Sequence, residues 1–185
     1  MIKLKCARAV IGLGIIYALS VFLAFGCREK RQSNLKYKFI SIAAPAGSYI
    51  KTFPDWLPND PWADFCVIMP LRNRDIYIHI SSMTSKSRMT GGQSIEVVAK
   101  MLEGALKQEG KVISEGKVTV TKRKMKGKLW SEKIGERIVT QVIAWDKEIL
   151  FKAMWACTES EQKMVENKVV RLLKKVDFEI DFSSK

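Results

Sequence analysis

Hydrophobic and polar residues alternate along most of the chain beyond residue 36, which is the period of a strand with one buried face. The alternation is clearest where Ile76, Ile78 and Ile80 interleave with Tyr77 and His79. Similar runs predict strands over residues 37–42, 65–71, 75–83, 117–121, 128–134, 137–145 and 149–157, with a short last strand around residues 178–182.

Short turns are expected between the later strands. Gly127, Gly135 and Asp146-Lys147 mark chain reversals, and residues 72–75 form the turn between two earlier strands. Links this short favour an antiparallel meander.

Two segments have the 3.6-residue period of an amphipathic helix. In the first, Ser94 is the expected N-cap and Gly110 the expected residue after the helix. The second begins at Thr158 and Glu161, which have the spacing of a capping box. The expected order along the chain is a group of strands, a helix, a second group of strands, a second helix and a last strand. This order is typical of the α+β class, so we expect a mostly antiparallel sheet of about six to eight strands flanked by helices.

Residues 44–64 form a loop that holds four of the five prolines together with several aromatic residues, among them Trp56 and Trp62. Such a loop either closes an edge of the core or forms a binding lip. Residues 84–93, with Gly91-Gly92, are expected to be a mobile loop.

The first 27 residues have the organisation of an export signal. Lys3, Lys5 and Arg8 precede an uncharged run over residues 10–25, and Gly26-Cys27 follows. A small residue before a cysteine resembles the bacterial lipobox, although Ala24 stands where leucine is favoured. An uncleaved anchor and an ordinary cleaved signal are the alternatives.

These observations divide the chain into a signal peptide (1–26), a tether after a lipidated Cys27 (27–35) and one domain (36–183). The domain is expected in the cell envelope of a bacterium, held to the membrane by lipid and facing the periplasm or the exterior. Removal of residues 1–26 leaves a formal charge of +10. In that compartment a basic surface meets anionic lipid, acidic polymers or proteins rather than nucleic acid.

Cys66 and Cys157 remain after processing, both in apolar runs. In an oxidising compartment they could pair, which would add roughly 4 kcal/mol of stability, or stay as buried free thiols.

Catalytic motifs are absent from the sequence. His79 is the single histidine, and no spacing of Cys or His residues forms a metal site. A Cys–His pair would need a reactive thiolate, which apolar surroundings disfavour. We therefore expect a protein that is not an enzyme and has no cofactor and no metal.

The sharpest surface feature is a basic hairpin made of Lys122, Arg123, Lys124, Lys126 and Lys128. It either docks on anionic headgroups or is a solvated tip whose charges discourage edge aggregation.

The order of elements resembles the PsbP-like group. The resemblance rests on the run from Phe39 to Pro45, the aromatic loop, the helix at 94–109, the run at 112–118, the Thr158-Glu159-Ser160 helix entry and the closing Val176-Asp177-Phe178. It implies an α/β/α sandwich, shared with a Ran-GTPase release factor and small bacterial envelope lipoproteins, over residues 36–182. It supplies no catalytic residue.

We therefore expect a monomeric, non-catalytic envelope lipoprotein that binds or stabilises an unknown protein partner, with Trp56 and Trp62 as anchors. The alternatives are a module that docks on lipid or another polyanion through the basic hairpin, and a small-ligand protein with a pocket under the aromatic loop.

Overall fold

A computed structural model describes residues 34–53, 60–72, 74–108 and 112–179 of the chain. Cys27 and Trp56 lie outside these residues, as does the expected helix end at Gly110. No helix in the described ranges is long and apolar enough to cross a membrane.

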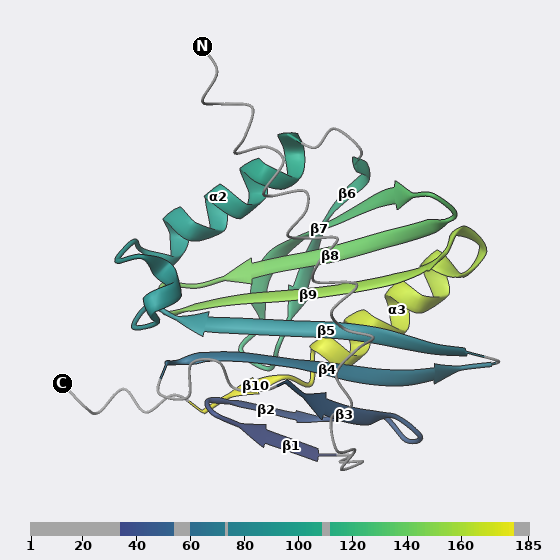
Figure 1. Cartoon of the computed structure of the whole chain (residues 1–185), viewed down its shortest axis with the longest axis horizontal. Coiled ribbons are helices and arrows are strands. Elements are labelled where there is room, and N and C mark those ends of the chain that lie inside the picture. Colours follow the sequence, from purple (N-terminus) through teal and green to yellow (C-terminus); the bar gives the residue numbers. More distant parts are fainter. Residues whose placement is uncertain (1–33, 54–59, 73, 109–111, 180–185) are drawn as a thin grey trace. The chain divides into compact units, whose positions relative to one another are not determined.

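The larger sheet contains seven strands in the order β3-β4-β5-β9-β8-β7-β6, and every neighbouring pair is antiparallel (Figure 1). Its strands are β3 (Tyr49–Thr52), β4 (Trp62–Leu71), β5 (Arg74–Thr84), β6 (Val112–Val120), β7 (Met125–Ile134), β8 (Arg137–Trp145) and β9 (Ile149–Thr158). The expected α+β class and the meander from β6 to β9 are confirmed.

A smaller sheet joins both ends of the domain. Strands β1 (Asn34–Tyr37), β2 (Ile40–Ala43) and β10 (Asp177–Phe178) pair in the order β1-β2-β10. The prediction of one continuous first strand is wrong, because Lys38 takes a left-handed backbone conformation (φ 52°) and turns the chain into a hairpin.

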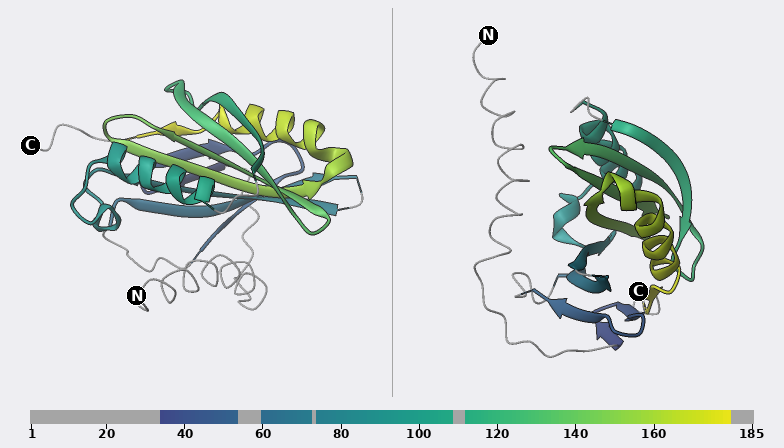
Figure 2. Two further views of the ribbon diagram at one scale, coloured as in Figure 1. Left: turned by 90° about the horizontal axis from the view of Figure 1, so that it is seen from above. Right: turned by 90° about the vertical axis from the view of Figure 1, so that its right-hand side faces the viewer.

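The helices α2 (Ile95–Gln108) and α3 (Gln162–Leu173) lie on opposite sides of the larger sheet (Figure 2). On the α3 side, Val165, Val169 and Leu172 pack with the main core of β4, β5, β8 and β9. On the α2 side, Ile95 and Ala99 pack with a smaller cluster that contains Trp130, Ile143 and Leu150.

The N-terminal cap predicted from the sequence is found at the first helix but not at the second. The Ser94 hydroxyl accepts a hydrogen bond from the Val97 amide at 3.4 Å, which confirms Ser94 as the cap. At the second helix, Thr158 precedes a short 3-10 turn (η2, Glu159–Glu161), and its hydroxyl donates to the Glu161 carboxylate at 2.6 Å instead of capping the backbone. α3 therefore starts later than the capping-box spacing predicts.

Gly127 lies inside β7 and not at a reversal, which corrects the sequence interpretation. A Cβ atom there would come within 2.5 Å of the Ile143 carbonyl oxygen, so the glycine permits close pairing of β7 and β8. The reversal before β7 is made instead by Thr121 and Lys124, both with positive φ.

Candidate functional site

Trp62, one of the two predicted anchors, is the first residue of β4 and is partly buried. It pairs across the strands with Met83 of β5, and Met83 packs against the cluster beneath α2. The other predicted anchor, Trp56, lies outside the described residues. Trp62 therefore belongs to the α2 side of the sheet, where part of its side chain remains exposed.

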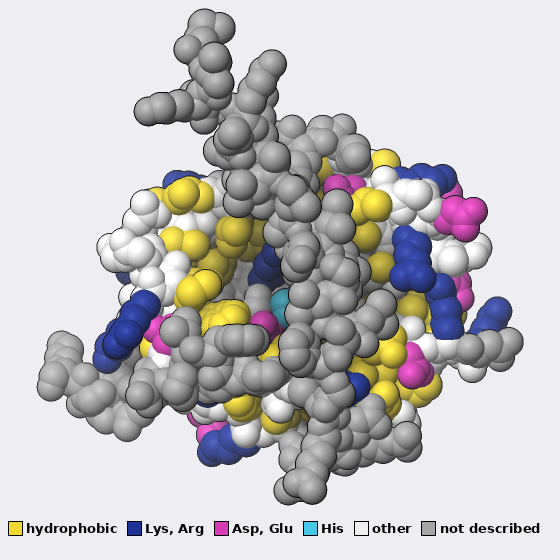
Figure 3. Space-filling view, in the orientation of Figure 1, with side chains coloured by type: hydrophobic (Ala, Val, Ile, Leu, Met, Phe, Trp, Pro, Cys, Tyr) yellow, Lys and Arg dark blue, Asp and Glu magenta, His cyan; other side chains and the backbone are white. Residues whose placement is uncertain are grey.

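Several large hydrophobic side chains are exposed on α2 and in the turn that precedes it. On α2, Met101 is 60% exposed and Val97 is 44% exposed, and their i,i+4 spacing makes them neighbours on its outer face. Met89, in the 3-10 turn η1 (Arg88–Thr90) that precedes α2, is 50% exposed. We call Trp62, Met83, Met89, Val97 and Met101 the α2 surface; hydrophobic side chains gather over α2 and the adjacent strand ends in Figure 3.

The buried Asp60 carboxylate links the segment that carries Met89 to the start of β4. Its oxygens accept hydrogen bonds from the Ser87 hydroxyl at 2.5 Å and from the Arg88 amide at 2.7 Å. Ser87 in turn caps η1 by accepting from the Met89 amide. The segment that the sequence presented as a mobile loop is therefore fastened to the start of β4. Sequence reasoning missed Asp60, since it falls in a proline-rich loop with no local signal.

Beside this surface, polar side chains form a cluster on the α2 side of β4, β5 and β9. His79 Nε2 donates a hydrogen bond to Asp64 Oδ1, and the Phe53 ring meets the imidazole edge-on at 5.8 Å. Burial lowers the pKa of Lys152, and the nearby Asp64 carboxylate partly offsets this effect. Asp64 thus lies between His79, which it contacts, and Lys152.

The cluster brings Cys66 directly opposite His79 in the β4–β5 register. Burial raises the pKa of the Cys66 thiol to about 12. The thiol therefore stays protonated at neutral pH, and it lies 3.8 Å from the carbonyl oxygen of Val67. A Cys–His pair is present in space, but its sulfur lacks the thiolate character of a nucleophile.

Cys66 and Cys157 are both free and buried. Cys157 belongs to the core on the α3 side, whereas Cys66 alternates with Phe65 and Val67 of that core and faces the α2 side. The sheet therefore separates the two thiols, and the bridge considered from the sequence is not formed.

The basic hairpin is partly neutralised by its own domain. Lys122 pairs with Asp177 at 3.1 Å and Lys128 with Glu103 of α2 at 2.8 Å. Arg123 donates to the Phe178 carbonyl oxygen at 3.3 Å. Lys124 and Lys126 are exposed, and no ion pair forms on them within the described ranges. Among the described residues there is also no group of three or more His, Cys, Asp or Glu that could hold a metal ion.

Comparison with known proteins finds no matching family model and no matching curated protein. The fold is similar to the solution structure of cyanobacterial PsbP (CyanoP) from Synechocystis sp. PCC 6803, with a TM-score of 0.44 and 12% sequence identity. The similarity covers 84% of this chain and 98% of that one. At 12% identity the similarity describes the fold only, and it says nothing about the residues of the site.

Proposed function

We propose that this chain is a non-catalytic envelope lipoprotein that binds a protein partner through the α2 surface. The observation that carries the proposal is the exposure of Met101 and Val97 on the outer face of α2, on the side of the sheet to which partly buried Trp62 also belongs. Methionine and tryptophan are enriched at protein interfaces, where a few such side chains dominate the binding energy.

The charges on and beside α2 indicate what the partner offers. Glu96 pairs with Lys100 at 2.7 Å, and Glu103 pairs with Lys128 at 2.8 Å. Because these charges are already matched, the partner is expected to contribute an apolar patch rather than a strongly charged one.

The absence of catalysis is part of the proposal. It is supported by the raised pKa of Cys66, due to burial, and by the engagement of His79 with Asp64. Membership of the PsbP-like group rests on the sequence pattern and the order of elements, and the tether rests on Cys27. In this proposal the lipid on Cys27 holds the domain in the periplasm or outside the cell, close to a membrane that raises its local concentration near a partner.

Polyanion docking through the basic hairpin is the weaker candidate. Lys122 and Lys128 already pair with acidic side chains of this domain, so a polyanion would have to displace them.

The test is affinity purification of the full-length chain from membranes, as wild type and as Trp62→Ala. A specific protein should co-purify with the wild type and be lost with the variant, while the melting temperature changes by only a few degrees. An equal yield of that protein from both would contradict the proposal. Mass spectrometry of the same sample should find acyl chains on Cys27; an unmodified N-terminal segment would remove the lipid anchor.

A further inference from the structure

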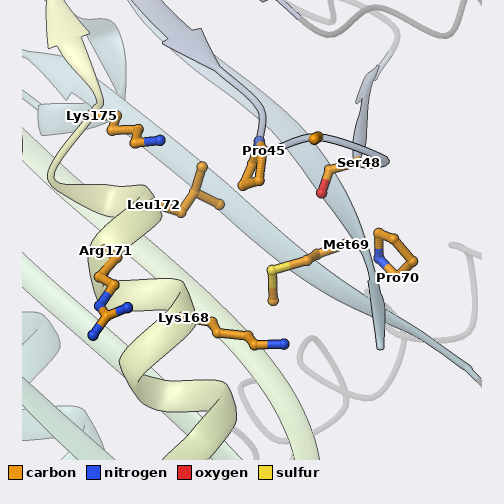
Figure 4. Close-up of a pocket in the computed structure, with 9 residues that line it drawn as sticks. Pro45, Ser48, Met69, Pro70, Lys168, Arg171, Leu172 and Lys175 are labelled. Atoms are coloured by element: carbon orange, nitrogen blue, oxygen red, sulfur yellow. The ribbon is translucent and has the colours of Figure 1, made fainter. Parts of the chain in front are cut away.

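A cavity lies on the other side of the sheet, between α3 and the turn that joins β2 to β3. Its volume is about 320 Å³. Figure 4 shows Pro45, Ser48 and Met69 on one side and Lys168, Arg171 and Lys175 of the α3 segment on the other. Pro45 and Ser48 belong to the first part of the segment 44–64, under which the sequence suggested a small-ligand pocket, whereas Trp62 at its other end lies on the α2 side of the sheet.

Three positive charges line this cavity. Lys168 and Arg171 are three residues apart on one face of α3, and Lys175 lies in the turn that follows the helix, where its amide donates to the Leu172 carbonyl oxygen at 2.9 Å. All three are exposed, and none forms an ion pair with a described residue. In Figure 4 the amines of Lys168 and Lys175 extend toward the β2–β3 side, whereas the Arg171 guanidinium points away and would join by a change of side-chain rotamer.

Ser48 supplies the second, independent observation. It is 7% exposed, and its hydroxyl oxygen has no hydrogen-bond partner among the described residues. Gly47, with φ 79°, permits the tight turn in which the Ser48 amide donates to the Pro45 carbonyl oxygen at 2.9 Å. The turn therefore fixes a buried hydroxyl at the cavity wall without satisfying it.

The helix dipole accounts for cations near the end of α3, but it does not account for an unpartnered buried hydroxyl. A ligand with several acceptor oxygens and negative charge accounts for both. A phosphate monoester carries about −1.5 to −2 charges and three acceptor oxygens at neutral pH, which suits three cations better than a single carboxylate does.

We propose that this cavity binds a phosphate monoester group, with Ser48 donating to one oxygen and Lys168, Arg171 and Lys175 balancing the charge. Pro45, Met69 and Leu172 form an apolar wall for the body of the ester. The volume is at the low end for ligand pockets, which suits a small phosphorylated molecule or a lipid headgroup.

This site is independent of the proposed function, because the α2 surface lies on the opposite side of the sheet. Loss of phosphate binding would leave partner binding intact, and the reverse also holds.

The test uses the full-length chain in detergent and calorimetric titration with inorganic phosphate, with chloride at matched ionic strength as the reference. Saturable binding of phosphate is expected. Lys168→Gln/Arg171→Gln should weaken it at least tenfold, since two charge-assisted contacts are lost. Lys124→Gln/Lys126→Gln removes the same charge outside the cavity and should leave it unchanged.

A parallel arm measures binding to vesicles of phosphatidic acid in phosphatidylcholine against phosphatidylcholine alone. Binding of phosphatidic acid vesicles that the cavity variant loses, without binding of free phosphate, would support the same site with a lipid headgroup as the source. Equal losses in the cavity and hairpin variants would show an unspecific charge effect and overturn the proposal, as would no binding in either arm.

Ser48→Ala separates a binding role from a structural one. Because the hydroxyl is buried and unpartnered, its removal should raise the melting temperature of the free protein while weakening phosphate binding roughly tenfold. A less stable variant that binds phosphate normally would contradict the assignment.

Discussion

Asp64 and His79 are hydrogen-bonded diagonally across β4 and β5, on the side of the sheet that faces α2. Lys152 of β9 lies near the same carboxylate. The single histidine of the chain, which the sequence left without a role, is thus part of a charge-matched cluster. Asp64 is the anion on which this cluster depends.

Asp64→Asn should lower the free energy of unfolding by about 1–3 kcal/mol, because His79 is left with a neutral acceptor and partly buried Lys152 loses a compensating charge. Urea denaturation at pH 7 measures the change. Asp75→Asn on β5 is the matched control, since Asp75 is exposed and should cost less than about 0.5 kcal/mol. Equal effects of the two substitutions would show that the cluster adds nothing to stability.

The Cys66 thiol makes the free energy of unfolding decrease as the pH rises in the alkaline range. Burial raises the pKa of its thiol from 9.0 to about 12, so above pH 9 the unfolded chain releases a proton that the folded chain keeps. Stability should therefore fall by up to roughly 1.4 kcal/mol per pH unit between pH 9 and 12.

Urea denaturation of the wild type and of Cys66→Ala at pH 8.5 and pH 10.5 isolates the contribution of this thiol to the free energy of unfolding. All other ionisable groups are present in both chains, so their effects cancel. The wild type should lose roughly 2 kcal/mol more than the variant over this interval. Parallel losses in the two chains would show that the thiol ionises as easily in the folded state as in the unfolded one.

Asp60→Asn should loosen the connection between β5 and α2. The substitution removes charge from an acceptor that serves both the Ser87 hydroxyl and the Arg88 amide, at a cost of about 1–3 kcal/mol. Hydrogen exchange should accelerate over residues 85–92 and stay unchanged in the β7–β8 hairpin, which serves as the internal control. Uniform acceleration throughout the chain would indicate a global loss of stability instead of a local release.

Most of the element order could be predicted from the sequence because the alternation in β5 and the helical spacing in α2 are local properties. The hairpin at Lys38 could not, since a lysine with positive φ gives no turn signal. The side of the sheet on which each cysteine lies could be predicted only in part. Cys66 alternates with Phe65 and Val67 and so faces the other side, but the continuous apolar run of β4 hides this alternation in the sequence.

The sites were less accessible to sequence reasoning than the fold. The residue type of Trp62 suggested an anchor, whereas Val97 and Met101 gave no signal because the opposite face of their helix packs into the core. The cavity at Ser48 joins a turn near residue 48 to a helix face near residue 171. That juxtaposition is set by the pairing of β2 with β10 after α3, which no local pattern encodes.

The central claim, partner binding through the α2 surface, is tested most directly by photo-crosslinking in intact cells. A photoreactive amino acid replaces Met101 in one variant and Ile134, 49% exposed in the β7–β8 hairpin, in the other. The account predicts a discrete crosslinked species from position 101 that Trp62→Ala abolishes, and none from position 134. The same species from both positions, or none from position 101, would contradict it.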